Sequence, residues 1–161
     1  MNKFLFDRNQ KGTPLELLIA DYWHSIGIPF GFNPYSGTDD PRREDYDLYL
    51  GQPEAATLFE AKMDWGSGIT GNIFVEEKAL ANTKASKIVY GRLLIDVFDR
   101  TRLVEMYNAR CQGMHVYKHV ITGGDQAHNP GMLLNWKDCK ANSQPLWAVT
   151  KQLRQRHEVH H

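Results

Sequence analysis

Cysteine is scarce in this sequence, and long apolar runs are absent. With two cysteines in 161 residues, Cys111 and Cys139, the chain lacks the composition of a disulfide-stapled secreted domain, and both thiols are expected to be reduced. No apolar run approaches the ~20 residues that a membrane-spanning helix needs, and the first residues show no signal-peptide pattern. The composition therefore predicts a cytoplasmic protein that does not enter a membrane.

An excess of either charge sign is also missing. Lysine and arginine number 19, and aspartate and glutamate also number 19. Many nucleic-acid-binding proteins carry a basic excess, which this chain does not have. A protein that holds a divalent cation needs clustered carboxylates, however, and these cancel basic residues in the total while leaving local positive patches. The net charge therefore does not exclude a nucleic-acid partner.

Linkers, low-complexity stretches and internal repeats are lacking as well. A length of 161 residues and a hydrophobic content of 42% fit one domain with one core of ordinary depth. We expect a single domain over residues 1–161, with a core over about residues 13–125 and a C-terminal extension over residues 126–161.

The first regular element is a helix from about Pro14 to Ser25. Thr13, Pro14 and Glu16 match the capping-box pattern, and Gly27 ends the helix. The apolar residues fall on one arc at helical spacing, and Glu16 lies at the edge of that arc. Its carboxylate can therefore reach the interior, although a role confined to capping the helix is the alternative.

Two segments with strand alternation follow after residues 28–32, which begin a strand, and a loop over residues 33–44. In residues 45–51 the side chains of Asp47 and Leu48 point to opposite faces of the strand. In residues 57–63 the side chains of Glu60 and Lys62 point to the same face. If Leu50 pairs with Thr57 across the hairpin loop, antiparallel register puts Asp47 directly opposite Glu60. Two carboxylates and a lysine then share one face of the sheet.

These groups suit the hydrolysis of a phosphodiester bond. Mg²⁺ or Mn²⁺ activates water and stabilises the charge that develops on phosphorus, and such hard cations prefer oxygen ligands. Asp47, Glu60 and the carbonyl of Ala61 would form a partial cage, to which Glu16 would add a third carboxylate. Lys62 would orient or help deprotonate the water and steady the phosphate. A merely solvated, charged strand face is the alternative.

The rest of the chain alternates between the two kinds of element. Residues 72–84 form a helix or a strand running into a helix, residues 85–91 and 93–98 form strands, and residues 101–112 form a helix. Another strand over residues 115–121 and a last helix over residues 145–155 complete the pattern. This order predicts a mixed sheet flanked by helices.

A zinc site is a weaker alternative. Cys111, His115 and His119 are spaced by four, which would align them on one continuous helix. A break at Gln112-Gly113 would instead separate them, and we favour that break. Bound zinc would make the chain an interaction module.

On these residues the sequence resembles the PD-(D/E)XK nuclease superfamily, which includes restriction enzymes, Holliday-junction resolvases and phage nucleases. The resemblance rests on Glu16 in the leading helix, Asp47 in the second strand and Glu60-Ala61-Lys62 in the third. Residues 70–76 and 83–90 are similar to small phage and bacterial members, with Asn72 and Glu76 as auxiliary candidates. Tyr46 stands where the family name has proline.

The resemblance implies a restriction-endonuclease-like αβββαβ core and a DNA endonuclease that depends on Mg²⁺ or Mn²⁺. It implies Asp47, Glu60, Lys62 and Glu16 as catalytic residues, and branched or site-specific DNA as the substrate. Lys84, Lys87 and Arg92 are candidates for contact with DNA. Members of this superfamily often cut as dimers, so a homodimer is expected by analogy. The alternative is a nuclease-fold protein that binds nucleic acid without cutting it.

Overall fold

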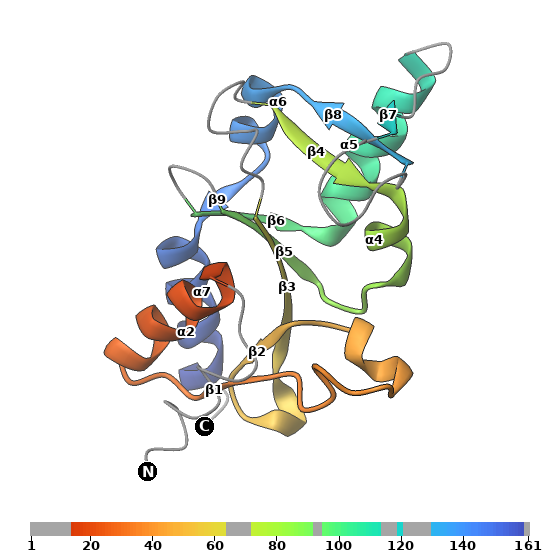
Figure 1. Ribbon diagram of the computed structural model, residues 1–161. Coiled ribbons are helices and arrows are strands. Elements are labelled where there is room, and N and C mark those ends of the chain that lie inside the picture. Colours follow the sequence, from red (N-terminus) through yellow and green to blue (C-terminus); the bar gives the residue numbers. More distant parts are fainter. Residues whose placement is uncertain (1–13, 64–71, 92–94, 114–118, 121–129, 160–161) are drawn as a thin grey trace.

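The computed structural model describes residues 14–63, 72–91, 95–113, 119–120 and 130–159 (Figure 1). In chain order the elements are α2 (Pro14–Ser25), β1 (Phe30–Phe32), η1 (Pro41–Glu44), β2 (Leu48–Leu50), η2 (Pro53–Ala55), β3 (Thr57–Met63), β4 (Ile73–Glu76), α4 (Glu77–Asn82), β5 (Lys87–Gly91), β6 (Ile95–Asp99), α5 (Arg100–Gly113), β7 (His119–Val120), β8 (Pro130–Leu134), α6 (Trp136–Ala141), β9 (Gln144–Pro145) and α7 (Leu146–Val159). Here η marks a short 3₁₀ turn. Within these ranges no helix has the length and apolarity to cross a bilayer.

The main sheet is mixed, with strand order β1-β2-β3-β5-β6-β9. All neighbours are antiparallel except β3 and β5, which pair in parallel. Parallel neighbours need a crossover, and β4 with α4 supplies it between them. The elements α2, β1, β2, β3, α4 and β5 follow the predicted αβββαβ order. The predicted mixed sheet flanked by helices is confirmed.

One face of the main sheet packs against α2 and α7, which lie side by side in Figure 1. Leu48, Leu50 and Phe59 are buried there together with Trp23 of α2. The indole Nε1 of Trp23 donates a hydrogen bond to Oγ1 of Thr150, at 3.1 Å, across 127 residues of sequence. The C-terminal helix is therefore part of the core that holds α2 against the sheet.

The other face carries a second core, built with α5 and α6 and with a small sheet of order β4-β8-β7. This small sheet was not predicted from the sequence. The parallel register pairs Glu60 with Ile88 and Lys62 with Tyr90, and both of these β5 residues are buried in the second core. Since paired residues point to the same face, Glu60 and Lys62 face this side, away from α2.

Glycines fix how α2 ends and where it rests. Gly27 has φ +71°, and the amides of Gly27 and Ile28 donate to the carbonyls of His24 and Trp23, as in a Schellman C-cap. At the end of β5, a Cβ on Gly91 would lie 2.7 Å from Cδ1 of Leu15. The first turn of α2, which also carries Glu16, can therefore rest directly on the sheet.

Candidate active site

Asp47 lies at the point where β2 separates from β3. The predicted pairing of Leu50 with Thr57 is confirmed, but the ladder ends at Leu48 and Phe59, one residue before Asp47. The Asp47 amide donates to the Phe59 carbonyl at 2.8 Å, so Asp47 and Leu48 both lie against Phe59 in the manner of a β-bulge. The prediction that Asp47 pairs directly with Glu60 was therefore wrong.

The bulge aims the Asp47 carboxylate across the gap between the strands. Its Oδ2 accepts a hydrogen bond of 2.7 Å from the backbone amide of Ala61. The carboxylate thus takes the position that a backbone carbonyl of β2 would hold if the ladder continued. Since β-bulges re-aim side chains next to functional sites, this local irregularity brings Asp47 to the Glu60-Ala61-Lys62 segment.

Glu60 is held by two partners on its face of the sheet. Its Oε1 lies 3.2 Å from Nζ of Lys62, and its Oε2 accepts a hydrogen bond of 3.2 Å from the Thr83 hydroxyl. Thr83 is buried and also accepts a hydrogen bond from the Ala85 amide, which fixes its position in the turn before β5. Thr83 was not recognised as a site residue in the sequence, although it opens the segment that resembles phage nucleases.

Glu16 approaches Asp47 from the other face of the sheet. It is 7% exposed on α2, which confirms that its side chain reaches the interior. It raises the pKa of Asp47, so the two carboxylates are electrostatic neighbours. The helix that carries Glu16, α2, covers the face opposite to Glu60 and Lys62.

Burial and repulsion from a neighbouring carboxylate disfavour the charged forms of the Asp47 and Glu60 carboxyl groups. Burial, reinforced by Glu16, raises the pKa of Asp47 to about 6 despite the Ala61 hydrogen bond and the Lys62 charge. Burial and the charge of Asp47 raise the pKa of Glu60 to about 7. Burial opposes the charged form of Lys62, but Glu60 and Asp47 outweigh it, so the pKa of Lys62 is raised. The two carboxylates therefore favour the charged form of Lys62.

These side chains line a cavity of about 370 Å³. Its walls come from η1, the bulge, β3, β4 and α4, and its lining residues are Arg43, Glu44, Asp47, Glu60, Lys62, Glu76, Lys78, Ala79, Asn82 and Thr83. The lining carries three basic and four acidic side chains. Asp47, Glu60 and Lys62 thus meet in one hollow, as predicted, while Glu16 does not line it.

The donor atoms fit a hard divalent cation. Because the amide of Ala61 points toward Asp47, the Ala61 carbonyl points the same way, as N–H and C=O of one strand residue share a side. In the described ranges no three histidine, cysteine or acidic side chains are grouped to hold a metal. Of the ligands predicted from the sequence, the Asp47 and Glu60 carboxylates both line the cavity, and the Ala61 amide is bonded to Asp47. Magnesium sites commonly use one or two carboxylates and fill the rest with water and phosphate oxygens.

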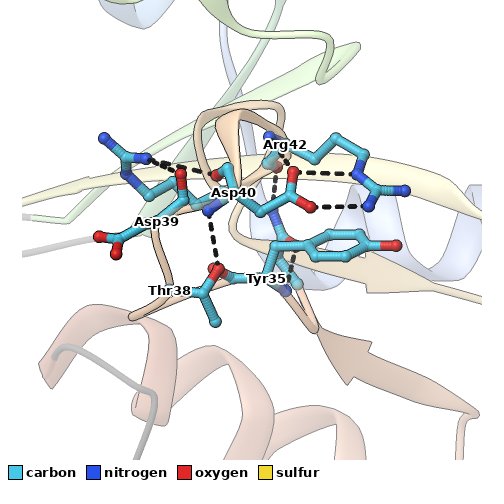
Figure 2. A network of polar contacts seen from close by, with 7 residues as sticks. Tyr35, Thr38, Asp39, Asp40 and Arg42 are labelled. Carbon is cyan, nitrogen blue, oxygen red and sulfur yellow. Dashed lines mark hydrogen bonds and ion pairs between the residues drawn. The ribbon is translucent and has the colours of Figure 1, made fainter.

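The loop before Asp47 is fixed by Asn33, which sequence reasoning missed. Asn33 is 0% exposed, and its Nδ2 donates to the carbonyls of Arg42 and Tyr46 at 2.8 Å each. The backbone amide of Asn33 donates to the backbone carbonyl of Asp47 at 2.9 Å. The two hydrogen bonds from the Arg42 guanidinium to the Asp40 carboxylate stiffen the same loop (Figure 2). An asparagine directly after a predicted strand and before a long loop was the available signal.

The remaining predicted residues are distributed around this cavity. Glu76 lines it and helps to raise the pKa of Lys62, after the larger effects of Glu60 and Asp47. Asn72 precedes β4 and is half-buried outside the lining. Lys84 and Lys87 form ion pairs with Asp45 and Asp99 respectively and do not line the cavity. Arg92 lies outside the described residues.

The alternative zinc set is not assembled within one helix. Gln112 and Gly113, where the sequence predicted a break, are still helical in α5, and Cys111 is half-buried on the same helix. His119 begins β7, and His115 lies outside the described residues.

Comparison with known proteins gives a likeness in fold alone. No family model and no curated protein match the chain. Among solved structures, a bacterial homing endonuclease, I-Ssp6803I, superposes with a TM-score of 0.52 at 14% sequence identity, over 94% of this chain and 96% of that one. The chain therefore shares its fold with a nuclease.

Proposed function

We propose that this protein is a PD-(D/E)XK-type endonuclease that hydrolyses DNA phosphodiester bonds with Mg²⁺ or Mn²⁺. The observation that carries the proposal is the meeting of Asp47, Glu60 and Lys62 in one cavity, with the Asp47 carboxylate bonded to the backbone amide of Ala61. The fold shared with a homing endonuclease supports DNA as the substrate. A charged cluster on a solvated strand face would not account for the burial of both carboxylates.

Each residue has a distinct task in the proposed reaction. Asp47 and Glu60 would hold the cation together with the Ala61 carbonyl, and the repulsion between the two carboxylates favours a positively charged partner. The bound cation would activate a water molecule and stabilise charge on the phosphate. Lys62 stays protonated and stabilises the negative charge that develops on the phosphate oxygens. Thr83 holds the Glu60 carboxylate in place.

Glu16 has a supporting task in the proposal. Glu16 is buried on α2 and acts electrostatically on Asp47, so its negative charge would favour uptake of the cation. We further propose that two copies of the chain cooperate to cut both strands of a branched or site-specific DNA in the cytoplasm. One active site of this kind cleaves one strand at a time.

Incubation of the purified protein with linear, nicked, flapped and four-way DNA tests the proposal. We expect cleavage with Mg²⁺ or Mn²⁺, none with a chelator, and binding without cleavage with Ca²⁺, which coordinates oxygen but activates water less well. Binding that is never followed by cleavage with any of these metals would favour the non-cutting alternative. Cleavage that persists unchanged in Asp47→Ala would refute the site.

A further inference from the structure

The adjacent residues Arg42 and Arg43 of η1 differ in how far their guanidinium groups are already engaged by partners within the protein. Arg42 donates from Nε and Nη2 to the two carboxylate oxygens of Asp40, at 3.0 and 2.7 Å. Its guanidinium also lies 3.8 Å from the ring centre of Tyr35, as Figure 2 shows. Both the N–H groups and the planar face of the Arg42 guanidinium therefore contact residues of the same loop, and these contacts stiffen the loop.

Arg43 is oriented without being neutralised. Its Nη1 donates to the carbonyl oxygens of Asp39 and Asp40, at 3.0 and 3.4 Å, and these oxygens carry no formal charge. Its Nη2 is 3.9 Å from Glu44, at the long limit of an ion pair between two half-exposed side chains. Arg43 therefore lines the cavity with a guanidinium that is held in the loop and has no close carboxylate partner.

The support beneath Arg43 is rigid. Buried Asn33 ties the carbonyl of the preceding residue, Arg42, to the sheet. Asp40 caps the 3₁₀ turn, because its Oδ1 accepts the Arg42 amide at 2.9 Å. A guanidinium that is held in position before binding loses less conformational entropy when it takes up a ligand.

A second cation faces the cavity from α4. Lys78 is exposed and lines the same hollow as Arg43. Figure 1 shows α4 and the orange turn of η1 on the same side of β3. The Arg43 side chain is 43% exposed and that of Glu60 is 13% exposed, so Arg43 lies nearer the rim of the cavity than the Glu60 carboxylate does.

We propose that Arg43 and Lys78 bind two backbone phosphates of the DNA that flank the phosphate to be cut. The inference rests on the proposed function and adds the contacts that seat the strand over the carboxylates. Guanidinium groups bind phosphate with a planar fork, and ammonium groups bind it as point charges. Such contacts fix the position of the strand without reading its sequence.

The test measures how DNA affinity depends on salt. Fluorescence anisotropy with a labelled DNA duplex in calcium chloride, at increasing potassium chloride, gives the slope of log affinity against log salt for each protein. Each phosphate contact contributes about 0.9 to that slope, so R43Q and K78Q should each lower its magnitude by about 0.9. The matched control is K137Q, on α6 at the opposite end of the molecule (Figure 1), which should leave the slope unchanged.

Two further readouts separate phosphate binding from folding and from chemistry. R43K, which keeps the charge but not the fork, should retain the wild-type slope. With Mg²⁺, R43Q should raise KM by on the order of tenfold while kcat changes little, because the contact is made equally in ground and transition states. Thermal melting of each variant verifies the fold.

The outcomes separate this inference from the proposed function. Lowered slopes for R43Q and K78Q, beside unchanged K137Q, support it. Wild-type cleavage with slopes for R43Q and K78Q equal to that of K137Q overturns the inference alone. A wild-type protein that neither binds nor cuts DNA overturns both.

Discussion

Two cavities of nearly equal size differ sharply in their electrostatics. The cavity that holds Asp47, Glu60 and Lys62 measures about 370 Å³, and a second one between α5, β8 and α6 measures about 400 Å³. In the second, Arg102 pairs with Glu105 at 2.8 Å, and both side chains are more than half exposed to water. In the first, buried carboxylates repel each other, and the pKa of each is raised.

The comparison teaches that volume does not identify a functional site here. In the second cavity the Arg102–Glu105 pair is exposed and screened by water, so its charges are stable without a ligand. In the first cavity burial and repulsion from a neighbouring carboxylate raise the pKa of both the Asp47 and the Glu60 carboxyl, although the Lys62 ammonium opposes that shift. Poorly solvated carboxylates cost free energy unless a ligand offsets their charge, and they are typical of functional sites. Matched substitutions in the two cavities test this difference.

The largest contrast should come from removing one cation in each cavity. Lys62→Ala should lower the cleavage rate by about 10²–10³-fold, since it removes a charge that stabilises the transition state. Arg102→Ala, which breaks the exposed pair in the second cavity, should leave the rate unchanged. Single-turnover cleavage assays measure both rates. Equal rates for Lys62→Ala and the wild type would show that the first cavity is not catalytic.

Metal binding should separate the cavities by thermal stability. At a hundredfold excess of Mg²⁺ over its Kd, binding to the folded state alone adds about 2.7 kcal/mol. For a chain of this size the melting temperature should rise by about 5–10 °C. Asp47→Asn should abolish that rise, and Asp138→Asn in the second cavity should keep it. A rise that survives in Asp47→Asn would place the cation elsewhere.

The loop anchors offer a third contrast. Asn33→Ala removes a buried side chain that satisfies two carbonyls, and it should cost about 2–3 kcal/mol of unfolding free energy and lower the cleavage rate. Asn142→Ala removes exposed bonds to Arg102 and Asp138 in the second cavity, and it should cost less than about 1 kcal/mol. Urea denaturation measures both. Equal costs would mean that the loop does not depend on Asn33.

The smallest effect concerns pH in metal-free protein. The folded pKa values of Asp47 and Glu60, about 6 and about 7, lie above the ordinary values of 3.8 and 4.5. The folded state therefore holds more protons than the unfolded state across this window, so stability falls as pH rises from about 4 to 7.

A neutral side chain at one of these positions should reduce that loss. Glu60→Gln should be more stable than the wild type by on the order of 1–3 kcal/mol near pH 8, with little difference near pH 4. Denaturation at a series of pH values tests this, and a wild-type stability that increases between about pH 4 and 7 would contradict the sign.

Local patterns in the sequence account for much of the fold. The helix from Pro14 to Ser25 and the strand from Thr57 to Met63 have the bounds that capping and alternation predict. The strand over residues 45–51 is shorter than predicted, covering Leu48–Leu50, because the bulge and the Asn33-anchored loop end it. The ambiguous segment over residues 72–84 is a strand followed by a helix, which the crossover between β3 and β5 requires.

What the sequence by itself determined is the shared face of Glu60 and Lys62, the buried position of Glu16 and the Leu50–Thr57 register. Each of these follows from spacing within one helix or one hairpin. The tertiary structure alone decided the bulge that aims Asp47, the Thr83 hydroxyl on Glu60 and the Arg43 charge on the rim. The physical reason is that these contacts join segments whose approach depends on loop conformation and on long-range packing, such as Trp23 against Thr150. Neither loop conformation nor long-range packing can be deduced from the periodicity of hydrophobic residues within one helix or strand.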